Sequence, residues 1–490
     1  MSFYKEIIKA KDEKPVPIFF NNKPMFSKYN SSKDVEIFTK QFLDLKEKKT
    51  LLIGGVGTGI HIKKLEAEKN ISIIFALEKD NEALEFSKRF FENSEKVIFC
   101  TLENFENKIL ENYIPQIHGD FFYKSLNSWI LALKEYDSSF DEKAFQEKIL
   151  STLKIISRDV ATQSYFGKIW HKNIFQNIKN FYKAFNNQLL ATNSLFDTNK
   201  TLAIIGASPN LDNTISELKD NPQKYFIIAT DTSFQILLQH KIIPQVVATL
   251  DGQSISSRHF MQKIPDSTIL LADFCGNPNI VEKFIKNKSK IAFTNTGHPL
   301  VALFDLWLYH INNTKSIYRV SSGNGTVLQL ALDFGFSLGF SKFQLFGAEF
   351  AYTQNKPYAK GTYFDFQYNC SATKISPTEN SFSNLMYKSK IIKNQEKITT
   401  ENLKAYKEYL DNYLKDKNYS YNKDVSLPKK FDYRDFFHWY INSLEKDEKN
   451  VKKTLFPLLA WINNYKKNSD NNNEALFFTK KLLQCLLNEE

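Results

Sequence analysis

The chain has 490 residues, and because a single hydrophobic core rarely grows beyond about 250 to 300 residues, we expect two to four domains. Hydrophobic residues make up 42% and aromatic residues 14% of the chain, which excludes a disordered protein and indicates a globular one. The formal net charge is +11, but the lysines are scattered among Asn, Glu and Asp without a dense basic tract or a stacking motif. This pattern favours a solvated, Lys-rich surface that also attracts small anions, and no nucleic-acid partner is expected.

The four cysteines show neither a CxxC motif nor metal-ligand spacing, which indicates reduced thiols in a cytosolic protein. The stretch MSFYKEIIKAKDEKPVPIFF lacks the basic, apolar and small-residue zones of a signal peptide. No stretch approaches the ~18 apolar residues that a membrane span needs. We therefore predict a cytoplasmic protein without a membrane span.

A first α/β pattern follows this N-terminal stretch. The apolar run TLLIGGVGTGI ends in glycines, a helical stretch follows, and the apolar runs ISIIFALEKD and KVIFCTLENF come next. This order, with a GxGxG motif (Gly55, Gly57, Gly59) and an acid about 20 residues further on (Glu78), is typical of Rossmann-like domains, in which the acid binds a ribose hydroxyl. No further strand is evident, because residues 120–190 look helical. We interpret the domain as a structural, degenerate Rossmann-like unit, with a methyltransferase that binds S-adenosylmethionine as the alternative.

From residue 201 the alternation of strands and helices restarts and is more complete. Apolar strands separated by helices predict a parallel sheet covered on both faces, which is a Rossmann-like α/β domain. The predicted strands are TLAIIG, KYFIIATD, PQVVATLDG, STILLADF, KIAFTNTG, SIYRV and FQLFGAEFA, and the predicted helices cover residues 211–219, 232–240, 279–287, 300–311 and 324–338.

The last part of the chain is mainly helical. We expect its apolar faces to cap the sheet domain, with binding of a partner as the alternative. The predicted domains are an N-terminal Rossmann-like domain (1–120), a helical connector (121–195), a catalytic α/β domain (196–400) and a helical C-terminal domain (401–490).

Ligands of open parallel sheets collect beyond the carboxyl ends of the strands, so polar residues there are the first candidates for a site. The first strand of the central domain leads into Gly206, Ser208 and Asn210, and an amphipathic helix follows. A glycine that admits a phosphate, a hydroxyl donor and the free N–H groups of a helix start together form an anion site. A plain turn with Ser208 as the N-cap is the alternative.

Acidic residues follow the next two strands. Asp231 precedes Thr232, and Asp251 begins the turn after the third strand. Each aspartate is suited to bind a ribose, a metal ion or a substrate hydroxyl, or else to cap the next helix. Their occurrence at successive strand ends favours a shared site.

Two later segments add candidates. A second glycine-rich helix start predicts another anion cradle, formed by Ser322, Gly323, Asn324 and Gly325. Beyond the last strand, Glu349 is a candidate base, and Tyr352, Tyr358 and Lys360 are candidate ligands of phosphate or carboxylate. His298, in a turn after a strand, is the histidine best placed for acid/base work, with a structural role as the alternative. The sequence holds no HExxH, Walker A, GxSxG or zinc pattern.

Three stretches carry a resemblance to a known family: GASPNLDNTISELK, ATDTSFQILLQHKIIPQVVATLDGQ and SSGNGTVLQLALDFGFSLGFSKFQLFGAEFAYTQNKPYAKGT. In this order they resemble the domain shared by motility accessory factors (Maf proteins) and 6-hydroxymethylpterin diphosphokinase MptE-like proteins. The resemblance covers about residues 200–365. The stretch SYFGKIWHKNIFQNI resembles the helical lead-in of Maf proteins, which also carry an N-terminal Rossmann-like domain. The short pterin enzymes lack these long flanking parts, so the domain order favours the Maf branch.

The resemblance implies a flagellin glycosyltransferase with a sialyltransferase-like fold. It implies transfer of a nonulosonic acid, such as pseudaminic or legionaminic acid, from its CMP-activated form to flagellin hydroxyls. It also implies that Gly206 and Ser208 lie at the nucleotide, that Asp231 and Asp251 line the donor site, and that the second cradle surrounds the phosphate. The reaction centre would lie between Gly347 and Tyr352, where the family's usual Asp is Glu349. The chemistry requires no metal or other cofactor, and Mg²⁺ is compatible with it.

Three alternative functions stay open. One is an ATP-dependent pterin pyrophosphokinase, in which Asp231 and Asp251 bind Mg²⁺. Another is the methyltransferase of the N-terminal domain. The third is a non-catalytic factor that holds flagellin through the C-terminal helices.

Overall fold

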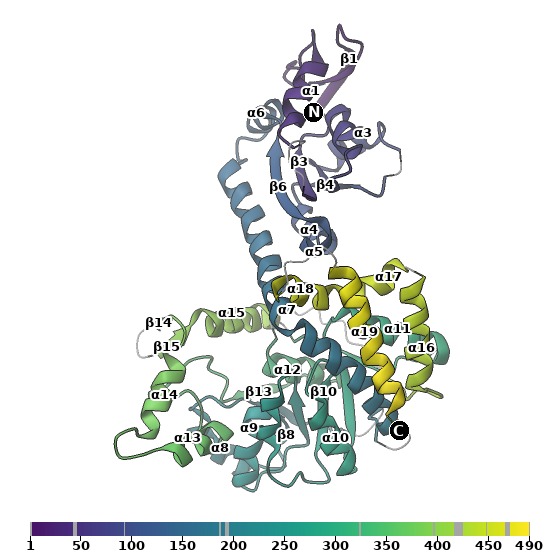
Figure 1. Ribbon diagram of the computed structural model, residues 1–490. Helices are drawn as coiled ribbons and strands as arrows, with labels where there is room; N and C mark the ends of the chain where they lie inside the picture. The colour runs from purple at the N-terminus through teal and green to yellow at the C-terminus, as the bar shows by residue number, and fades with distance from the viewer. Residues whose placement is uncertain are drawn as a thin grey trace. The chain divides into compact units, whose positions relative to one another are not determined.

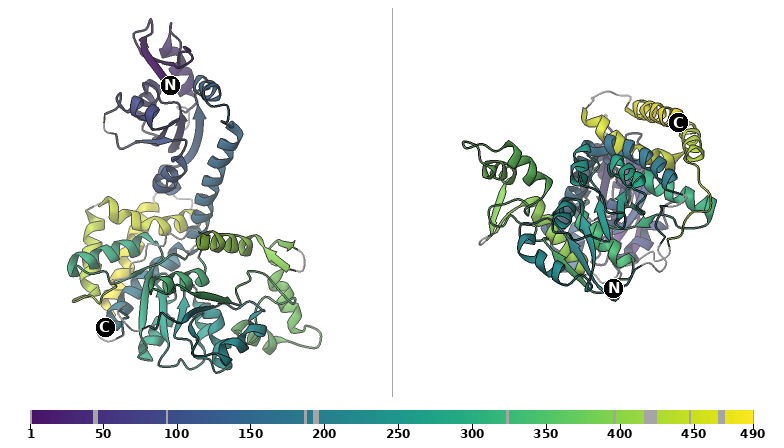
Figure 2. Two further views of the ribbon diagram at one scale, coloured as in Figure 1. Left: turned by 180° about the vertical axis from the view of Figure 1, so that it is seen from behind. Right: turned by 90° about the horizontal axis from the view of Figure 1, so that it is seen from below.

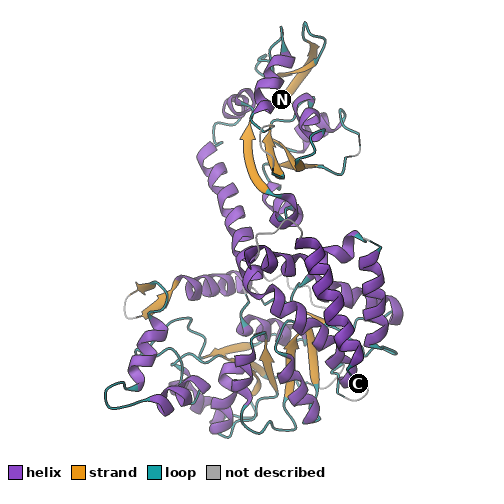
Figure 3. Cartoon of the chain, viewed as in Figure 1, coloured by secondary structure: helices purple, strands orange, loops and turns teal. Residues whose placement is uncertain are grey.

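The computed structural model describes residues 2–42, 47–92, 94–185, 188–191, 196–322, 325–394, 397–415, 425–446, 448–465 and 471–489. The chain forms two compact units, Met1–Ser164 (unit 1) and Tyr165–Glu490 (unit 2). Each unit combines a parallel sheet with helices (Figures 1 and 3). Among the described residues we find no helix whose length and hydropathy would let it span a bilayer.

Unit 1 is built on four parallel strands in the order β5-β4-β3-β6. They are β3 (Lys49–Gly54), β4 (Ile71–Glu78), β5 (Val97–Thr101) and β6 (Asp120–Ser125). The helices are α1 (Ser31–Lys40), α2 (Ile60–Glu66), α3 (Asn81–Lys88), α4 (Phe105–Asn112), α5 (Pro115–His118) and α6 (Asn127–Tyr136), and an antiparallel hairpin of β1 (Tyr4–Lys9) and β2 (Pro15–Phe19) precedes them. The first three strands of the sheet are those predicted from their apolar runs.

Strand β6 corrects the prediction that residues 120–190 are helical. It pairs in parallel with β3 at the edge of the sheet. Phe121, Phe122 and Tyr123 are only half-buried, and the strand ends in Lys and Ser. DFFYKS therefore has neither the continuous apolar run of a central strand nor a clean alternation, and sequence periodicity gave no signal for it.

Unit 2 is centred on seven parallel strands in the order β12-β11-β10-β9-β8-β7-β13. They are β7 (Thr201–Ile205), β8 (Tyr225–Thr230), β9 (Val246–Thr249), β10 (Ile269–Asp273), β11 (Ile291–Asn295), β12 (Tyr318–Arg319) and β13 (Phe343–Phe346). Each lies within a predicted strand, so the predicted α/β fold with a central parallel sheet is confirmed. The chain proceeds from β7 outward to β12 and then returns to place β13 on the other side of β7.

Helices cover both faces of this sheet. Successive side chains of a strand point to opposite faces, so neighbouring residues of one strand pack against different helices. Ile205 packs with α8 (Leu211–Asp220), whereas Ile204 packs with α12 (Val327–Ser337). The face that carries α8 also carries α9 (Asp231–Gln239), α10 (Pro278–Lys286) and α11 (Pro299–Asn312). These five helices were predicted, although α12 begins at Val327 rather than at 324.

The C-terminal helices complete the core on the face of α10 and α11. They are α16 (Tyr433–Glu445), α17 (Lys449–Lys452), α18 (Phe456–Tyr465) and α19 (Asn471–Asn488), and they pack with the second half of α7 (Glu142–Ala184). The rings of Phe436 and Phe304 are 4.9 Å apart, and those of Phe437 and Phe175 are 5.5 Å apart. The prediction that these helices cap the sheet is confirmed for the described residues.

The segment between β13 and the C-terminal helices was predicted only in part, because α15 alone lies in the helical stretch expected from residue 401. It holds α13 (Tyr363–Ser371), α14 (Thr378–Met386), α15 (Glu401–Lys415) and the antiparallel pair β14 (Ile391–Asn394) and β15 (Lys397–Thr400). Within unit 2 it lies beside the sheet, away from the yellow C-terminal helices (Figures 1 and 2). Tyr352 N donates to Ile398 O (2.7 Å), which joins this segment to the chain that leaves β13.

Candidate functional site

The strand order of unit 2 reverses between β7 and β13, and an open α/β sheet offers a ligand crevice at such a reversal. The turns after these two strands contact each other. Gly206 N donates to Phe346 O (2.8 Å) and Ser208 N donates to Gly347 O (2.9 Å). A Cβ atom on Gly206 would lie 2.3 Å from Gly347 O, so the close approach requires glycine. The structure thus places the predicted residues Gly206 and Ser208 at the reversal.

Asn210 and Glu349 meet at the same point. Asn210 Nδ2 donates to Glu349 Oε1 (3.0 Å). Glu349 Oε2 is buried and has no hydrogen-bond partner. Helix α8 begins at Leu211 with Asn210 as its N-cap residue, so Ser208 is not the N-cap. A carboxylate oxygen that is shielded from water and lacks a protein donor is available to a substrate hydroxyl.

Asp231 is the first residue of α9 and is only 5% exposed. Its Oδ1 accepts from Thr232 N (2.7 Å) and from Thr232 Oγ1 (3.1 Å), and its Oδ2 accepts from Thr249 Oγ1 (3.0 Å). Oδ1 therefore bonds within the first turn of α9, and Oδ2 joins the start of this helix to the end of β9. Thr232, a predicted nucleotide contact, donates its backbone N–H and its hydroxyl to Asp231.

Asp251 lies in the turn after β9, where its Oδ1 accepts from Gln253 N (2.9 Å). Burial raises the pKa of Asp251, the hydrogen bond from Gln253 N opposes this rise, and the negative charge of Asp231 adds to it. Two carboxylates that repel each other's charge lie in one neighbourhood. The structure therefore brings Asp231 and Asp251 together, as their positions at successive strand ends predicted.

The predicted Tyr358 lies near Asp231. Its ring stacks on Phe364, with centroids 4.9 Å apart and planes at 7°. Burial raises the pKa of Tyr358 to about 12, and the negative charges of Tyr352, Tyr368 and Asp231 add to the rise. The phenol is consequently neutral at physiological pH and retains a proton to donate to an anion.

Hydrogen bonds fasten the loop that carries Tyr358 to the turn after β7. We call the reversal of strand order at β7 and β13 the switch point. Ala359 N donates to Ala207 O (2.9 Å), and Lys360 N donates to Asp212 Oδ1 (3.0 Å). The Lys360 side chain is exposed. The part of Lys360 that the structure anchors is therefore its backbone.

His259 belongs to this neighbourhood but was not predicted. It lies in the 3₁₀ helix η1 (Ser254–Phe260), and its ring packs edge-on against Tyr363 (5.7 Å) and Phe364 (5.8 Å). His259 is 8% exposed, and its Nδ1 is buried without a hydrogen-bond partner. Its positive form lowers the pKa of Asp251. The stretch SISSRHF has no motif, so only its position in the loop after Asp251 could have drawn attention to it.

The start of α12 contains the second predicted cradle. Ser322 is buried, and its carbonyl accepts from Gly325 N (3.1 Å) and from Thr326 N (2.9 Å). Thr326 is the N-cap, because its Oγ1 accepts from Gln329 N (3.2 Å). Leu328 Cδ1 would lie 3.2 Å from a Cβ on Gly206, so this helix start borders the switch point.

Two members of that cradle, Gly323 and Asn324, lie outside the described residues. Gln329, the third residue of α12, is 1% exposed, and neither polar atom of its side chain has a hydrogen-bond partner.

His298 lies apart from these residues. It is the N-cap of α11, where its Nδ1 accepts from Leu300 N (3.2 Å), and its Nε2 is buried without a partner. β9 and β10 stand between β8 and β11, which at ~4.8 Å per strand separates the ends of β8 and β11 by about 14 Å. The structure gives His298 a capping role and does not bring it to Asp231 or Glu349.

We predict that His298→Asn makes unit 2 less sensitive to acid. Burial lowers the pKa of His298 to about 3, so the folded protein leaves it neutral where the unfolded chain takes up a proton below about pH 6.5. This stability is complete above pH 6.5 and is lost as the pH falls towards 3. Asn caps helices equally well. Denaturant unfolding should show wild type losing about 1 kcal/mol more than the variant between pH 6.5 and 5.5. Equal losses would contradict the prediction.

Metal ligands are not grouped in the described part of the chain. Within it, no three His, Cys, Asp or Glu side chains are placed to hold one metal ion. Asp231 and Asp251 are the nearest approach to a Mg²⁺ site, because they lie together and carboxylate oxygens are the ligands that Mg²⁺ takes.

The glycine-rich turn of unit 1 is occupied by the chain's own carboxylate. Glu78 is fully buried, and its Oε1 accepts from Val56 N (2.9 Å), Gly57 N (2.9 Å) and Tyr4 OH (2.7 Å). Its Oε2 accepts from Trp129 Nε1 (3.1 Å). In a cofactor-binding domain this turn would face the ligand, whereas here its N–H groups bind Glu78. This supports the interpretation of the GxGxG domain as a structural unit.

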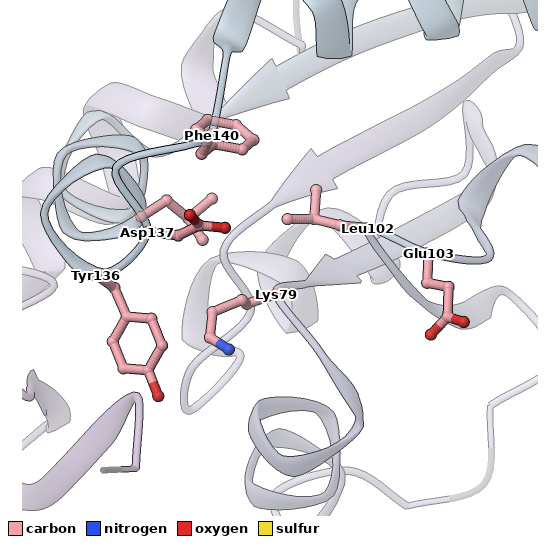
Figure 4. Close-up of a pocket in the computed structure, with 7 residues that line it drawn as sticks. Lys79, Leu102, Glu103, Tyr136, Asp137 and Phe140 are labelled. Atoms are coloured by element: carbon pink, nitrogen blue, oxygen red, sulfur yellow. The ribbon is translucent and has the colours of Figure 1, made fainter.

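A cleft of about 450 Å³ opens elsewhere in unit 1, beyond the carboxyl ends of β4 and β5 (Figure 4). It is lined by Lys79, Leu102, Glu103, Leu133, Tyr136, Asp137 and Phe140. Lys79 Nζ lies 4.4 Å from the centre of the Tyr136 ring and also pairs with Asp80. None of the residues predicted to carry chemistry lines this cleft, so we base the candidate site on the residues of unit 2.

Comparison with known proteins identifies the domain that carries this site. The family described as 6-hydroxymethylpterin diphosphokinase MptE-like matches residues 172–355. An uncharacterized protein of Treponema pallidum (strain Nichols) is 30% identical over 173 residues, which are 35% of this chain and 74% of the relative. The chain belongs to the MptE-like family. A second uncharacterized protein of the same organism is 28% identical over 209 residues, 41% of this chain and 70% of the relative.

The fold of this MptE-like protein is found in a solved structure described as a MAf glycosyltransferase from Magnetospirillum magneticum AMB-1. The likeness covers 99% of this chain and 91% of the other, with a TM-score of 0.53 and 11% sequence identity. It shows a shared fold. The MptE-like match and this fold together confirm the resemblance to the family of MptE-like and Maf proteins. The matched segment contains the switch point, Asp231 and Asp251.

Proposed function

We propose that the protein is a glycosyltransferase that moves a nonulosonic acid of the pseudaminic or legionaminic type from its CMP-activated donor to Ser or Thr hydroxyls of flagellin. The observation that carries this proposal is Glu349, whose buried, unpartnered Oε2 lies where the turns after β7 and β13 meet. The likeness of nearly the whole chain to a MAf glycosyltransferase supports the class of reaction.

The chemistry fits the groups at this site. In the donor, the bond between the anomeric carbon and the CMP phosphate oxygen breaks, and the electron pair leaves with the phosphate. The acceptor oxygen then bonds to the anomeric carbon, and its proton passes to a base. We assign the base to Glu349, with Asp251 as the alternative. The starts of α8 and α12 and the neutral Tyr358 are suited to stabilise the departing phosphate.

The remaining assignments follow from this reaction. Gly206, Ser208 and Asn210 would contact the nucleotide, and Asp231 with Thr232 would shape the site from β8. Tyr352 and Lys360 would bind substrate near the reaction centre. We place the reaction in the cytoplasm, with flagellin as the partner and motility as the purpose of the modification.

An ATP-dependent pterin pyrophosphokinase is the second candidate, because the matching family is described by that activity. Asp231 and Asp251 would then bind Mg²⁺, although Asp231 already accepts hydrogen bonds on both oxygens. A non-catalytic flagellin-binding factor is the third candidate.

Thermal unfolding with candidate ligands separates these functions. We expect CMP to raise the unfolding temperature, since a ligand at ~100 times its Kd stabilises by about 2.7 kcal/mol. ATP with Mg²⁺ and S-adenosylmethionine, tested separately, should have little effect. A shift with ATP and Mg²⁺ alone would favour the pyrophosphokinase. Flagellin binding without a response to any of these three ligands would favour the non-catalytic factor.

A further inference from the structure

Three asparagines of α7, at positions i, i+4 and i+7, share one face of the helix. They are Asn173, Asn177 and Asn180, and their exposed fractions are 9%, 0% and 0%. Buried side-chain amides persist only where they find partners. Asn173 and Asn177 donate through Nδ2 to backbone carbonyls of the loops beyond the sheet, and Asn180 donates to the backbone carbonyl of Pro278, the first residue of α10.

The acceptors of Asn173 distinguish it from its two neighbours. Asn173 Nδ2 donates to Gly252 O (2.9 Å), in the loop after β9, and to Cys275 O (3.0 Å), in the loop after β10. Asn177 donates only to carbonyls of the β10 loop, and Asn180 donates to Pro278 O (3.2 Å) and to Asn177. Asn173 is thus the member of the group that joins the two loops.

The loop after β9 fits closely between these partners. A Cβ on Gly252 would lie 2.7 Å from Cys275 O and 3.0 Å from Asn173 Nδ2, so the loop leaves no room for a side chain there. In addition, Asn277 N, in the loop after β10, donates to Asp251 O (3.1 Å). The backbone of Asp251 and Gly252 is therefore held by α7 and by the loop after β10.

We infer that Asn173 is a positioning residue that holds Asp251 in the candidate site. Asp251 directly precedes Gly252, and its carboxylate is oriented by Gln253 N of the same loop. The helix η1, which carries His259, follows at once. A shift of this loop moves both side chains together. The inference rests on the proposed function only in its prediction about catalysis.

The test compares Asn173→Ala with Asn180→Ala as the matched control, in the full chain. We expect Asn173→Ala to lower kcat for sugar transfer at least about tenfold with little change in KM, because a shift of the loop that carries Asp251 misplaces the donor relative to Glu349, and small misplacements are costly in rate. Asn180→Ala should leave kcat unchanged.

Hydrogen exchange over residues 250–257 keeps the inference testable without activity. We expect faster exchange in Asn173→Ala than in Asn180→Ala or wild type. Gly252→Ala, which pushes the loop from α7, should reproduce this effect if Asn173→Ala fails to fold. Equal exchange, or equal kcat in the two asparagine variants, would overturn the inference. Wild type that neither transfers sugar nor binds CMP would instead refute the proposed function, and exchange would then decide the inference alone.

Discussion

Glu349→Gln should abolish sugar transfer while leaving nucleotide binding intact. The substitution keeps the size and the hydrogen-bond acceptor that Asn210 Nδ2 uses, but it removes the free carboxylate oxygen that would take the acceptor's proton. A positioned general base contributes about 10²–10⁴-fold to a rate, so we expect kcat to fall by about that factor. Transfer to flagellin measured at saturating donor, together with the CMP-induced shift in unfolding temperature, checks both parts.

The control for this experiment is Glu408→Gln, which changes a carboxylate on the exposed surface of α15. It should have wild-type turnover and a wild-type CMP response. Full turnover of Glu349→Gln would exclude Glu349 as the base, and Asp251→Asn would then be the variant to examine. Loss of the CMP response would instead assign Glu349 to nucleotide binding or to the stability of the switch point.

Much of the central fold follows from the sequence, because each strand of a buried parallel sheet is a continuous apolar run. TLAIIG and KYFIIATD needed no tertiary information, and the polar residues after them pointed to the edge of the sheet that carries the candidate site. Other elements were not predicted because their sequences lack such an apolar run. Strand β6 is a half-buried edge strand, and the segment of α13, α14, β14 and β15 lies beside the sheet with few buried side chains, so neither has a strong pattern.

The site was predictable only where topology alone brings residues together. Asp231 and Asp251 follow neighbouring parallel strands, and their proximity is a consequence of that geometry. His259 and Asn173 carry no such signal, because each reaches the site through a tertiary contact. His298 follows a strand as well, but β11 lies too far along the sheet and its side chain is used as a helix cap.

The N-terminal motif is ambiguous for a related physical reason. A turn with free N–H groups binds an anion, and the sequence does not say whether that anion is a cofactor or a side chain. In unit 1 the anion is Glu78 itself. The spacing of glycines and acid is the same in both cases, and only the positions of Tyr4 and Trp129 distinguish them.

Glu78→Gln should destabilise unit 1 by about 3 kcal/mol or more. Burial raises the pKa of Glu78, and hydrogen bonds from Gly57 N, Tyr4 OH and Val56 N oppose that rise. All its partners are donors, so an amide would turn its own N–H groups towards at least one of them and leave a buried donor unpaired. For a unit of about 160 residues, this loss lowers the unfolding temperature by roughly 10 °C.

Limited proteolysis on heating, with fragments assigned to unit 1 or unit 2, measures this effect where it occurs. Glu103→Gln is the control, because Glu103 follows the neighbouring strand β5 but is exposed, and its change should stay within about 0.5 kcal/mol of wild type. A stable Glu78→Gln protein that had lost a wild-type response to S-adenosylmethionine would show that Glu78 binds a cofactor. A destabilised unit 1, in a protein whose wild type ignores that cofactor, would establish Glu78 as the internal anion that folds the glycine-rich turn.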